Sequence, residues 1–448
     1  MKKFLAVLAV LAITVTGVTA FAADVTLGGS VELRSRMFDD LDLNSKADDN
    51  DRYTQERVRL DVNVKSDNVK GKVQIENDWD NWGRLEAPQA TESVIVPGKT
   101  YNETDSKTYK NAGRLTLREA WMDFKLPGTP VNVKAGHQLL SLGHGWFFRD
   151  MKYGSDAWLI TSASESNLLG FVDIKVDERE LAKSDDKDAY VILDSYKIND
   201  SNTAGFDYTR VLTRDYLYKV NTTDTTYTSS GKNDTLDNLG LNYTGKVGPV
   251  ALKAEVDLQM GSKEGAAGAA DVDYKGNQFV IQASMPMDAL TLNATIAKGS
   301  GQDTSKDNTL FQTIMDKDAH YTVVYEYALT TAAGAKNTGF ANTQAINIGA
   351  GYKVSDSLNV SLDLWLLSAS EKTNVATKIN SAATAGAKSD KVGTEVDARL
   401  NWKLYDNLTW NWVAGYFIPG DVYKGRVGVN TVGEDAATVI QGVLSMKF

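Results

Sequence analysis

The last ten residues of the chain, VIQGVLSMKF, alternate with a period of two. One face of this stretch carries Ile440, Gly442, Leu444, Met446 and Phe448. Period two is the spacing of a β-strand, whose side chains point alternately to opposite faces, and it does not fit an α-helix. The same alternation recurs from about residue 25 to the C-terminus, so it predicts a fold built from strands.

The length of each alternating run decides which kind of β-protein to expect. The segments VALKAEVDLQM (250–260) and LNVSLDLWLL (358–367) are examples. Such runs approach the roughly 9–11 residues that cross a bilayer at a tilt, whereas strands of soluble proteins average about five or six residues. In hydrocarbon every backbone N–H and C=O must be paired, and a sheet achieves this only by closing on itself. We therefore predict an all-β, transmembrane antiparallel up-and-down β-barrel.

The connections between the runs alternate between short and long. Short turns are expected at 66–68, 127–130, 246–249, 286–288, 355–357 and 405–407, and long polar stretches at 39–52, 80–113, 262–272, 300–319, 370–392 and 420–435. This pattern predicts short periplasmic turns and long extracellular loops. About 18 strands result if 204–220 is one strand and 320–329 belongs to a loop, and 16 is the alternative.

The N-terminus is typical of a secreted protein. Lys2 and Lys3 precede an apolar run and small residues at 20–22, so we predict a signal peptide at 1–22 and one barrel domain at 23–448. Loss of the leader would reduce the 48 lysines and arginines to 46, against 58 aspartates and glutamates, a net charge of −12. This acidic balance argues against a nucleic-acid partner. The expected location is the outer membrane of a Gram-negative bacterium.

The polar faces of the predicted strands should enclose water. They carry charges of both signs, which we expect to line a channel and to bias its ion selectivity, or alternatively to neutralise one another across neighbouring strands. The predicted lining residues are Glu32, Arg34, Arg36, Arg57, Arg59, Asp61, Lys70, Lys72, Glu76, Asp78, Glu119, Asp123, Lys134, Glu255, Asp257, Glu395, Asp397 and Arg399.

Aromatic residues mark two further features. The glycine-rich segment 140–158 either folds inward as a constriction loop or caps the extracellular rim. Its candidate residues are Trp146, Phe147, Phe148, Arg149, Asp150 and Lys152. A second set lies where the apolar faces end, as expected of aromatic girdles at the membrane interfaces. It comprises Trp79, Trp402, Trp410, Trp412, Tyr416 and Phe448.

Metal and catalytic sites are not expected. The chain has no cysteine, which excludes disulfides, thiolate metal sites and covalently attached c-type haem, and it has only three histidines. His137 and His144 lack the further ligands that zinc requires. No Gly-x-Ser-x-Gly nucleophile elbow occurs. We predict a protein that is not an enzyme and carries no cofactor.

Three segments resemble the alginate-export family of outer-membrane channels and its porin-like relatives. They are LREAWMDFKLPGTPVNVKAGHQLLSLGHG (117–145), KGSGQD (298–303) and GTEVDARLNWKLYDNLTWNWVAGYFIPGD (393–421). Members of that family tend to carry Gly-Arg-Gln where this chain reads Gly136-His137-Gln138. The terminal Phe448 is similar to the signature by which the barrel assembly machinery recognises its clients. Export of a polyuronate implies an arginine-lined path, and the mixed charges predicted above depart from it.

The leading functional prediction is a porin, a water-filled channel for passive diffusion of small hydrophilic solutes or ions. One alternative is an export channel for an anionic, alginate-like polysaccharide. Another is a barrel sheath around an electron-transfer cytochrome supplied by a separate chain. The expected partners are outer-membrane lipid, lipopolysaccharide and the assembly machinery, and the oligomeric state is left open between monomer and homotrimer.

Overall fold

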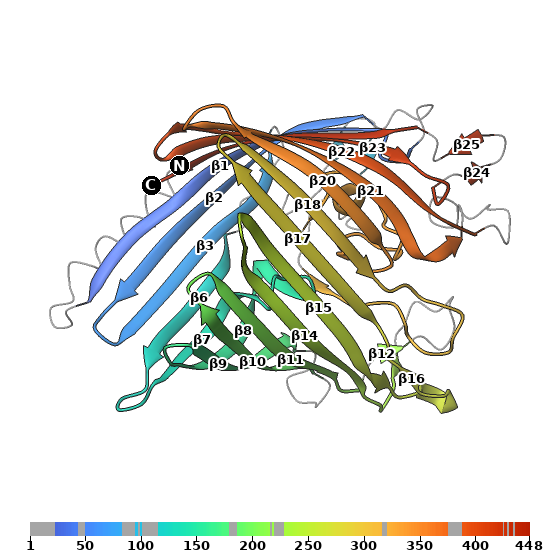
Figure 1. The fold of residues 1–448 in the computed structure, drawn as a ribbon. Helices are drawn as coiled ribbons and strands as arrows, with labels where there is room; N and C mark the ends of the chain where they lie inside the picture. Colours follow the sequence, from blue (N-terminus) through green and yellow to red (C-terminus); the bar gives the residue numbers. More distant parts are fainter. Residues whose placement is uncertain are drawn as a thin grey trace.

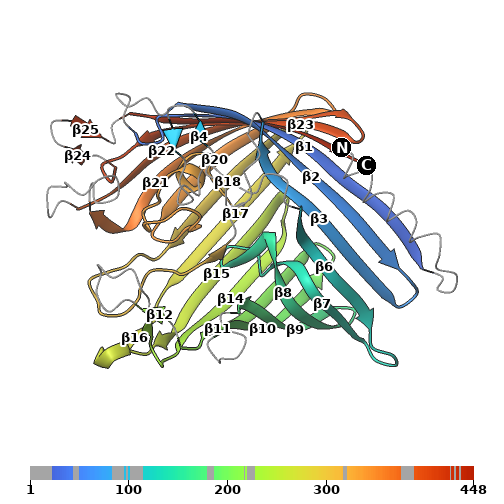
Figure 2. The ribbon, with the colours of Figure 1, turned by 180° about the vertical axis from the view of Figure 1, so that it is seen from behind.

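The computed structural model shows one closed ring of antiparallel strands (Figure 1). It describes residues 23–43, 50–82, 95–96, 99–100, 115–178, 186–215, 217–218, 228–315, 320–374, 388–423, 425–427, 430–432 and 435–448. The predicted signal peptide lies outside these residues. The strand that begins the described chain, Asp24–Asp39, and the strand that ends it, Ala437–Lys447, lie side by side, and the ring is also seen from behind in Figure 2.

Eighteen strands form the ring, which confirms the predicted fold and the larger of the two strand counts. They are β1 (Asp24–Asp39), β2 (Asp51–Lys65), β3 (Val69–Asn81), β6 (Leu115–Lys125), β7 (Val131–Ser141), β8 (Phe148–Ala163), β9 (Asn167–Asp177), β10 (Lys187–Asn199), β11 (Asn202–Thr213), β14 (Asp234–Val247), β15 (Val250–Lys263), β17 (Asn277–Met287), β18 (Leu290–Gly299), β20 (Gln344–Lys353), β21 (Leu358–Asn374), β22 (Lys388–Tyr405), β23 (Leu408–Pro419) and β26 (Ala437–Lys447).

Shorter elements decorate the connections. β16 (Val272–Asp273) and β19 (Ile314–Met315) pair with β15 and β8. The others are β4 (Ile95–Val96), β5 (Lys99–Thr100), β12 (Leu217–Tyr218), β13 (Thr228–Ser229), β24 (Gly425–Val427), β25 (Asn430–Val432), the 3-10 helix η1 (Ala266–Gly268) and the helix α2 (Tyr325–Ala328). No helix in the described part of the chain is long and apolar enough to cross a membrane.

Two conditions of the strand count are met. One ring strand, β11 (Asn202–Thr213), covers the first part of the region 204–220, whereas β12 at 217–218 lies in a separate two-stranded sheet, so the predicted strand was too long. The segment 320–329 lies in the connection between β18 and β20 and contains only α2. The strands are longer than expected, reaching 18 residues in β22. A tilted strand of about 9–11 residues already spans the hydrocarbon, so the extra residues extend the wall beyond it.

The wall is apolar outside and polar inside, the reverse of a soluble protein. On β15 the side chain of Asp257 is 2% exposed, whereas that of the next residue, Leu258, is 46% exposed. On β20 the values are 3% for Asn347 and 65% for Ile348. A strand turns successive side chains to opposite faces, so the period of two in the sequence becomes this division between lumen and exterior.

The two ends of the chain close the ring. β1 pairs with β26 from Ser30 opposite Lys447 to Asp39 opposite Thr438. Beyond the last strand residue, the backbone of Phe448 exchanges two hydrogen bonds with Gly29, with N···O distances of 3.0 and 3.1 Å. A β-carbon at Gly29 would lie 2.8 Å from the Phe448 ring, so a glycine is needed there. Closure leaves no open sheet edge to be exposed to lipid.

The apolar cores lie inside the ring at its loop end, where the long connections join the strands. The opposite end, with the short turns, is the turn end. Each core forms where a connecting segment packs against the inner face of the strands. In the first, Tyr321, Val324 and Phe340 of the β18–β20 connection pack against strand residues that include Trp365 and Phe417. In the second, Phe147 and Phe311 pack against Val172, Ile174 and Val191 of β9 and β10. The long connections therefore fold into the lumen.

The outward orientation of Ile348 can be tested by a charge substitution. Ile348→Arg is expected to lower the free energy of unfolding by about 2–4 kcal/mol, because an arginine at mid-membrane depth on the lipid face must leave water. Val354→Arg, in the turn that follows β20, should cost only about 0–1 kcal/mol. Urea unfolding of the barrel in lipid vesicles measures both. Equal effects of the two substitutions would contradict the assignment.

Candidate functional site

The segment 142–147, between β7 and β8, reaches across the lumen to β15. The backbone N–H groups of His144 and Trp146 donate hydrogen bonds to the carboxylate of Glu255, the second over 3.3 Å. The Nε2 of His144 donates to the carbonyl of Tyr243 on β14 over 3.1 Å. Burial lowers the pKa of His144, which favours the neutral form of its ring. Backbone and side-chain bonds together thus attach this short segment to the far wall.

Glycines make this approach possible. Gly143 and Gly145 have φ values of +51° and +82°, in the region that side chains with a β-carbon rarely adopt. A β-carbon on Gly143 would also lie 2.5 Å from Oε2 of Glu255. The predicted constriction segment is thus shorter than expected. Phe148, Arg149, Asp150 and Lys152 belong to strand β8, because the chain resumes strand pairing at Phe148.

A second segment, 320–343, fills another part of the lumen. The backbone N–H groups of Val323, Val324 and Tyr325 donate to the carboxylate of Glu395 on β22, at 2.7, 2.6 and 2.8 Å. The phenol of Tyr325 accepts the N–H of Ala332 at 2.9 Å. The sequence pattern predicted only a loop here. The sequence signal for an inward-folded segment was its content of tyrosine, valine and phenylalanine, because such side chains are too apolar for a solvated loop.

The two inward segments contact each other. The rings of Trp146 and Phe340 lie 4.8 Å apart between centroids, and those of Phe147 and Phe311 lie 6.3 Å apart. The N–H of Ile314 donates to the carbonyl of Phe147 over 2.8 Å, so β19 runs parallel to the start of β8. Parts of the chain far apart in sequence thus form one packed body inside the ring.

Ion pairs cover the inner face of β1, β2, β3 and β6. Arg57 pairs with Glu32 at 2.5 Å, Arg59 pairs with Glu76, and Lys72 pairs with Glu119 at 2.6 Å. Glu76 and Glu119 are buried, whereas the three basic side chains are partly exposed. At Arg59–Glu76 and Lys72–Glu119 the cation therefore lies over the acid and faces the lumen, whereas Arg57 and Glu32 are about equally buried. We call the inner face of β1, β2, β3, β6 and β7 the basic wall.

Other predicted lining residues complete the basic wall. Arg36 donates to Gln441 over 2.8 Å, and Asp123 accepts a bond from Asn132 over 2.9 Å. The ammonium of Lys134 lies 4.2 Å from the centre of the Trp121 ring, and Lys72 lies 3.5 Å from Asp61. Lys70 pairs in register with Asp123 at the turn end of β3.

Two β-bulges change the direction of side chains that the period of two would place outside. A register shift between Gln74 and Ile75 turns Arg118 inward, where its guanidinium donates to the carbonyls of Met151 and Lys152 at 2.5 and 3.1 Å. Arg118 also lies within 3.8 Å of Glu119. A bulge adds one residue and so reverses the face on which the following side chains lie. Simple alternation could not find Arg118.

The second bulge corrects the assignment of Trp79. This residue was expected in a lipid-facing girdle, but a register shift in the pairing of β2 with β3 turns it inward. Its ring lies between the guanidinium groups of Arg34 and Arg57, 3.8 and 4.2 Å from its centre. Asp78, beside it, lies 3.9 Å from Lys152. Trp79 is thus part of the basic wall.

The remaining girdle candidates lie on the exterior. Trp402, Trp410 and Phe448 are exposed near the turn end of the barrel, and Tyr416 is exposed toward the loop end. Trp412 covers Gly442, whose added β-carbon would lie 2.8 Å from the indole. These positions form two levels along the outer wall. Their interfacial role stays a prediction.

The acids of β15 and β22, whose inner faces we call the acidic wall, are buried. Glu255 and Asp257 on β15 and Glu395 and Asp397 on β22 were expected to face water, but they are 0–3% exposed. The inward segments cover Glu255 and Glu395. Asp257 accepts bonds from the amides of Asn238 and Gln278 at 2.8 and 2.7 Å. Arg399 pairs with Asp363 at 2.8 Å. The negative charge of this wall is thus shielded from the lumen.

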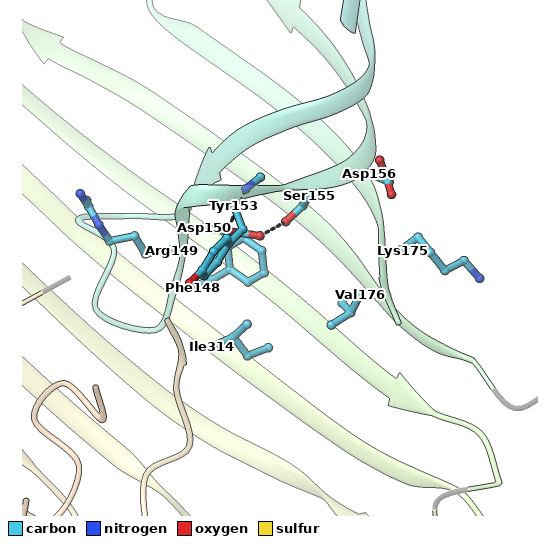
Figure 3. A pocket seen from close by; sticks show the side chains of 10 residues that line it. Phe148, Arg149, Asp150, Tyr153, Ser155, Asp156, Lys175, Val176 and Ile314 are labelled. Atoms are coloured by element: carbon cyan, nitrogen blue, oxygen red, sulfur yellow. Dashed lines mark hydrogen bonds between the residues drawn. The ribbon is translucent and has the colours of Figure 1, made fainter. Parts of the chain in front are cut away.

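A cavity of about 340 Å³ lies at the loop end of β8 and β9 (Figure 3). Ser155 donates to Asp150 over 2.7 Å at its centre, while Arg149 and Lys175 extend away from it. Nearby, His137 bonds to Asp156 through Nδ1 and to the carbonyl of Tyr153 through Nε2, both at 2.9 Å. Since Nε2 donates to a carbonyl, this histidine does not face a nucleophile as a general base would.

The histidine and acidic side chains of the described residues do not form a metal site. Within the described ranges, no three histidine or acidic side chains are placed to hold a metal ion. The functional feature of the lumen is instead its division into a basic wall, a shielded acidic wall and two inward segments.

A family model described as alginate export matches residues 24–433. The chain belongs to the alginate-export family. No curated protein matches it by sequence. Among solved structures from Pseudomonas aeruginosa, OccK9 (OpdG) has 13% identity and a TM-score of 0.56, covering 95% of this chain and 98% of that one. OccK2 (OpdF) in complex with glucuronate has 12% identity and a TM-score of 0.53, covering 95% and 96%. OpdK with vanillate has 13% identity and a TM-score of 0.52, covering 94% and 98%.

These comparisons identify the protein as a porin-like outer-membrane β-barrel channel of a Gram-negative bacterium. Its family and fold are those of channels, which are not enzymes. In the segment Gly136-His137-Gln138, which has histidine where family members tend to carry arginine, local structure accounts for the glycine and the glutamine. Gly136 has φ +121° and its added β-carbon would lie 2.3 Å from the carbonyl oxygen of Ala120. Gln138 is fully buried and donates to the carbonyl of Ala157 at 2.9 Å.

The bulge that turns Arg118 inward gives a stability prediction. Arg118→Ala should lower the free energy of unfolding by about 3 kcal/mol, because Gln74 and two backbone carbonyls lose their donor and Glu76 and Glu119 each lose one ion-pair partner in a buried position. The matched control is Lys403→Ala, which removes an exposed pair with Asp406 and should stay within about 0.5 kcal/mol. Urea unfolding in vesicles compares the two. An effect of Arg118→Ala no larger than the control would contradict the structural role.

Proposed function

We propose that this member of the alginate-export family is a passive channel for small hydrophilic solutes with a preference for anions. It needs no cofactor and carries out no covalent chemistry. Solutes diffuse through the ring from the loop end to the turn end, past the two inward segments. These segments, 142–147 and 320–343, narrow the path.

One observation carries the preference for anions. At Arg59–Glu76 and Lys72–Glu119 on the basic wall the cation lies over a buried acid, while Glu255 and Glu395 on β15 and β22 lie beneath the inward segments. The charges left facing the path are therefore mainly positive. In a narrow, partly desolvated lumen such charges attract anions and repel cations at close range.

The geometry of Trp79 favours planar anions within this class. Its indole lies between Arg34 and Arg57, so an aromatic surface and two guanidinium groups adjoin one another. Guanidinium groups bind carboxylates in a bidentate fork. Two of the similar barrels were solved with glucuronate and with vanillate, and both of these ligands bear a carboxylate. We extend this chemistry to the present chain as part of the proposal.

Export of an anionic polysaccharide is the second candidate, and family membership supports it. A polyuronate would use the same basic wall, but it would have to thread past both inward segments. The two candidates differ in their response to uronate oligomers. If the chain is a diffusion channel, monomeric glucuronate should carry current and oligomers should have little effect. A block by oligomers at concentrations that leave monomer flux unchanged would support export.

The expected partners remain predictions. Contact with outer-membrane lipid follows from the exposed apolar wall, whereas lipopolysaccharide binding, recognition of the C-terminal strand by the assembly machinery and the choice between monomer and homotrimer stay untested. The sheath around a cytochrome also stays a hypothesis, and no feature of the described lumen favours it.

The selectivity can be measured in planar bilayers. The zero-current potential in a KCl gradient should show that chloride is more permeant than potassium. The variant Arg34→Gln/Arg57→Gln should lower the chloride-to-potassium permeability ratio by about twofold, because two lumen cations are lost.

The control for this experiment is Lys403→Gln, which removes a half-exposed lysine at the turn end of β22 that is paired with Asp406. It should leave the permeability ratio unchanged. Cation selectivity of the unmodified protein, or equal shifts in the two variants, would refute the anion preference.

A further inference from the structure

The tripeptide Glu-Val-Asp occurs twice in the chain, at 255–257 and 395–397. Each copy lies in a different strand of the acidic wall, β15 and β22. In both copies the glutamate is buried and its carboxylate accepts backbone N–H bonds from a segment that has folded into the lumen. The same local sequence therefore makes the same kind of contact at two places.

We propose that Glu255 and Glu395 are positioning residues that set the aperture of the channel by latching the two inward segments to the wall. The inference rests on the proposed channel function and deepens it, because it identifies which groups hold the constriction in place. Neither glutamate needs to contact the solute.

The contacts at Glu395 require a carboxylate. Oε1 accepts the N–H groups of Val323 and Val324 at 2.7 and 2.6 Å, and Oε2 accepts that of Tyr325 at 2.8 Å. Three consecutive N–H groups thus surround one side chain. An amide of the same size offers one acceptor oxygen, and its NH₂ group would face a donor. Hydrogen bonds to a charged acceptor are also about twice as strong as those between neutral groups.

Glu255 makes the equivalent contact with a shorter segment. Its two oxygens accept the N–H groups of His144 and Trp146. The glycine at 143 lets the backbone come this close, since a β-carbon there would lie 2.5 Å from the carboxylate. Gly143→Ala should therefore loosen this latch without any change of charge.

The two latches act on one packed body. Trp146, which Glu255 holds, lies against Phe340 of the segment that Glu395 holds. Loss of one latch leaves the other segment attached but removes part of its packing. The double variant Glu255→Gln/Glu395→Gln should therefore change the conductance by more than the product of the two fold-changes that the single variants produce.

Single-channel recording in planar bilayers tests the proposal. Glu395→Gln should raise the conductance by about twofold and add noise, because segment 320–343 leaves the wall intermittently. Glu395→Asp keeps two acceptor oxygens. Its conductance and noise should therefore be closer to those of the unmodified protein than the values of Glu395→Gln are, although glutamine matches the size of glutamate better. The charge control is Asp406→Asn, which removes a fully exposed carboxylate in the turn between β22 and β23, away from both inward segments, and should leave conductance and noise unchanged.

A chemical readout separates the latch from general instability. The chain has no cysteine, so Val323→Cys introduces a unique thiol at a side chain that is 7% exposed. A water-soluble methanethiosulfonate reagent should modify it slowly, and about tenfold faster when Glu395→Gln is added, because the segment opens locally. Resistance of the folded barrel to SDS, read from its gel mobility, should be the same in both proteins.

The outcomes are distinct. If the unmodified protein does not conduct, the channel function itself is refuted. If it conducts but Glu395→Gln alters neither the conductance nor the rate at which the thiol of Val323→Cys is modified, the latch is refuted while the channel stands. A change of equal size in Asp406→Asn would also refute it, because the effect would then come from charge alone.

Discussion

The structure depends on the pairing of every backbone N–H and C=O in the wall. Lipid offers no hydrogen-bond partners, so a sheet in the membrane must close, and here it closes between β1 and β26 with Phe448 bonded back to Gly29. Closure turns one face of every strand to lipid and the other to a shared interior. The exposed Leu258 and Ile348 and the buried Asp257 and Asn347 follow directly from it.

A polar interior creates a second requirement, because buried carboxylates need donors. On the basic wall those donors are side chains, with arginine and lysine lying over Glu76 and Glu119. On β15 and β22 they are backbone N–H groups, which Glu255 and Glu395 receive from segments of the long connections. The same need for partners therefore makes one wall cationic and brings the constricting segments to the other.

Alternation in the sequence was sufficient to predict the barrel and its exposed outer face, and it narrowed the strand number to 18 or 16. It failed where one extra residue interrupts the pairing. Bulges turn the side chains of Trp79 and Arg118 into the lumen. The spacing of the neighbouring residues in the sequence does not reveal that an extra residue is present. It also treated Glu255 and Glu395 as facing water, because a strand pattern gives the face of a side chain but not what covers that face.

The sequence by itself determined that this chain forms a closed membrane barrel. Strands long enough to cross the membrane can pair all their backbone groups in hydrocarbon only when the sheet closes on itself. Tertiary structure alone decided how the interior is divided. The contact between Trp146 and Phe340, and the bonds from Val323, Val324 and Tyr325 to Glu395, join parts of the chain far apart in sequence. Such contacts exist only after the ring has closed and placed these residues within reach of each other.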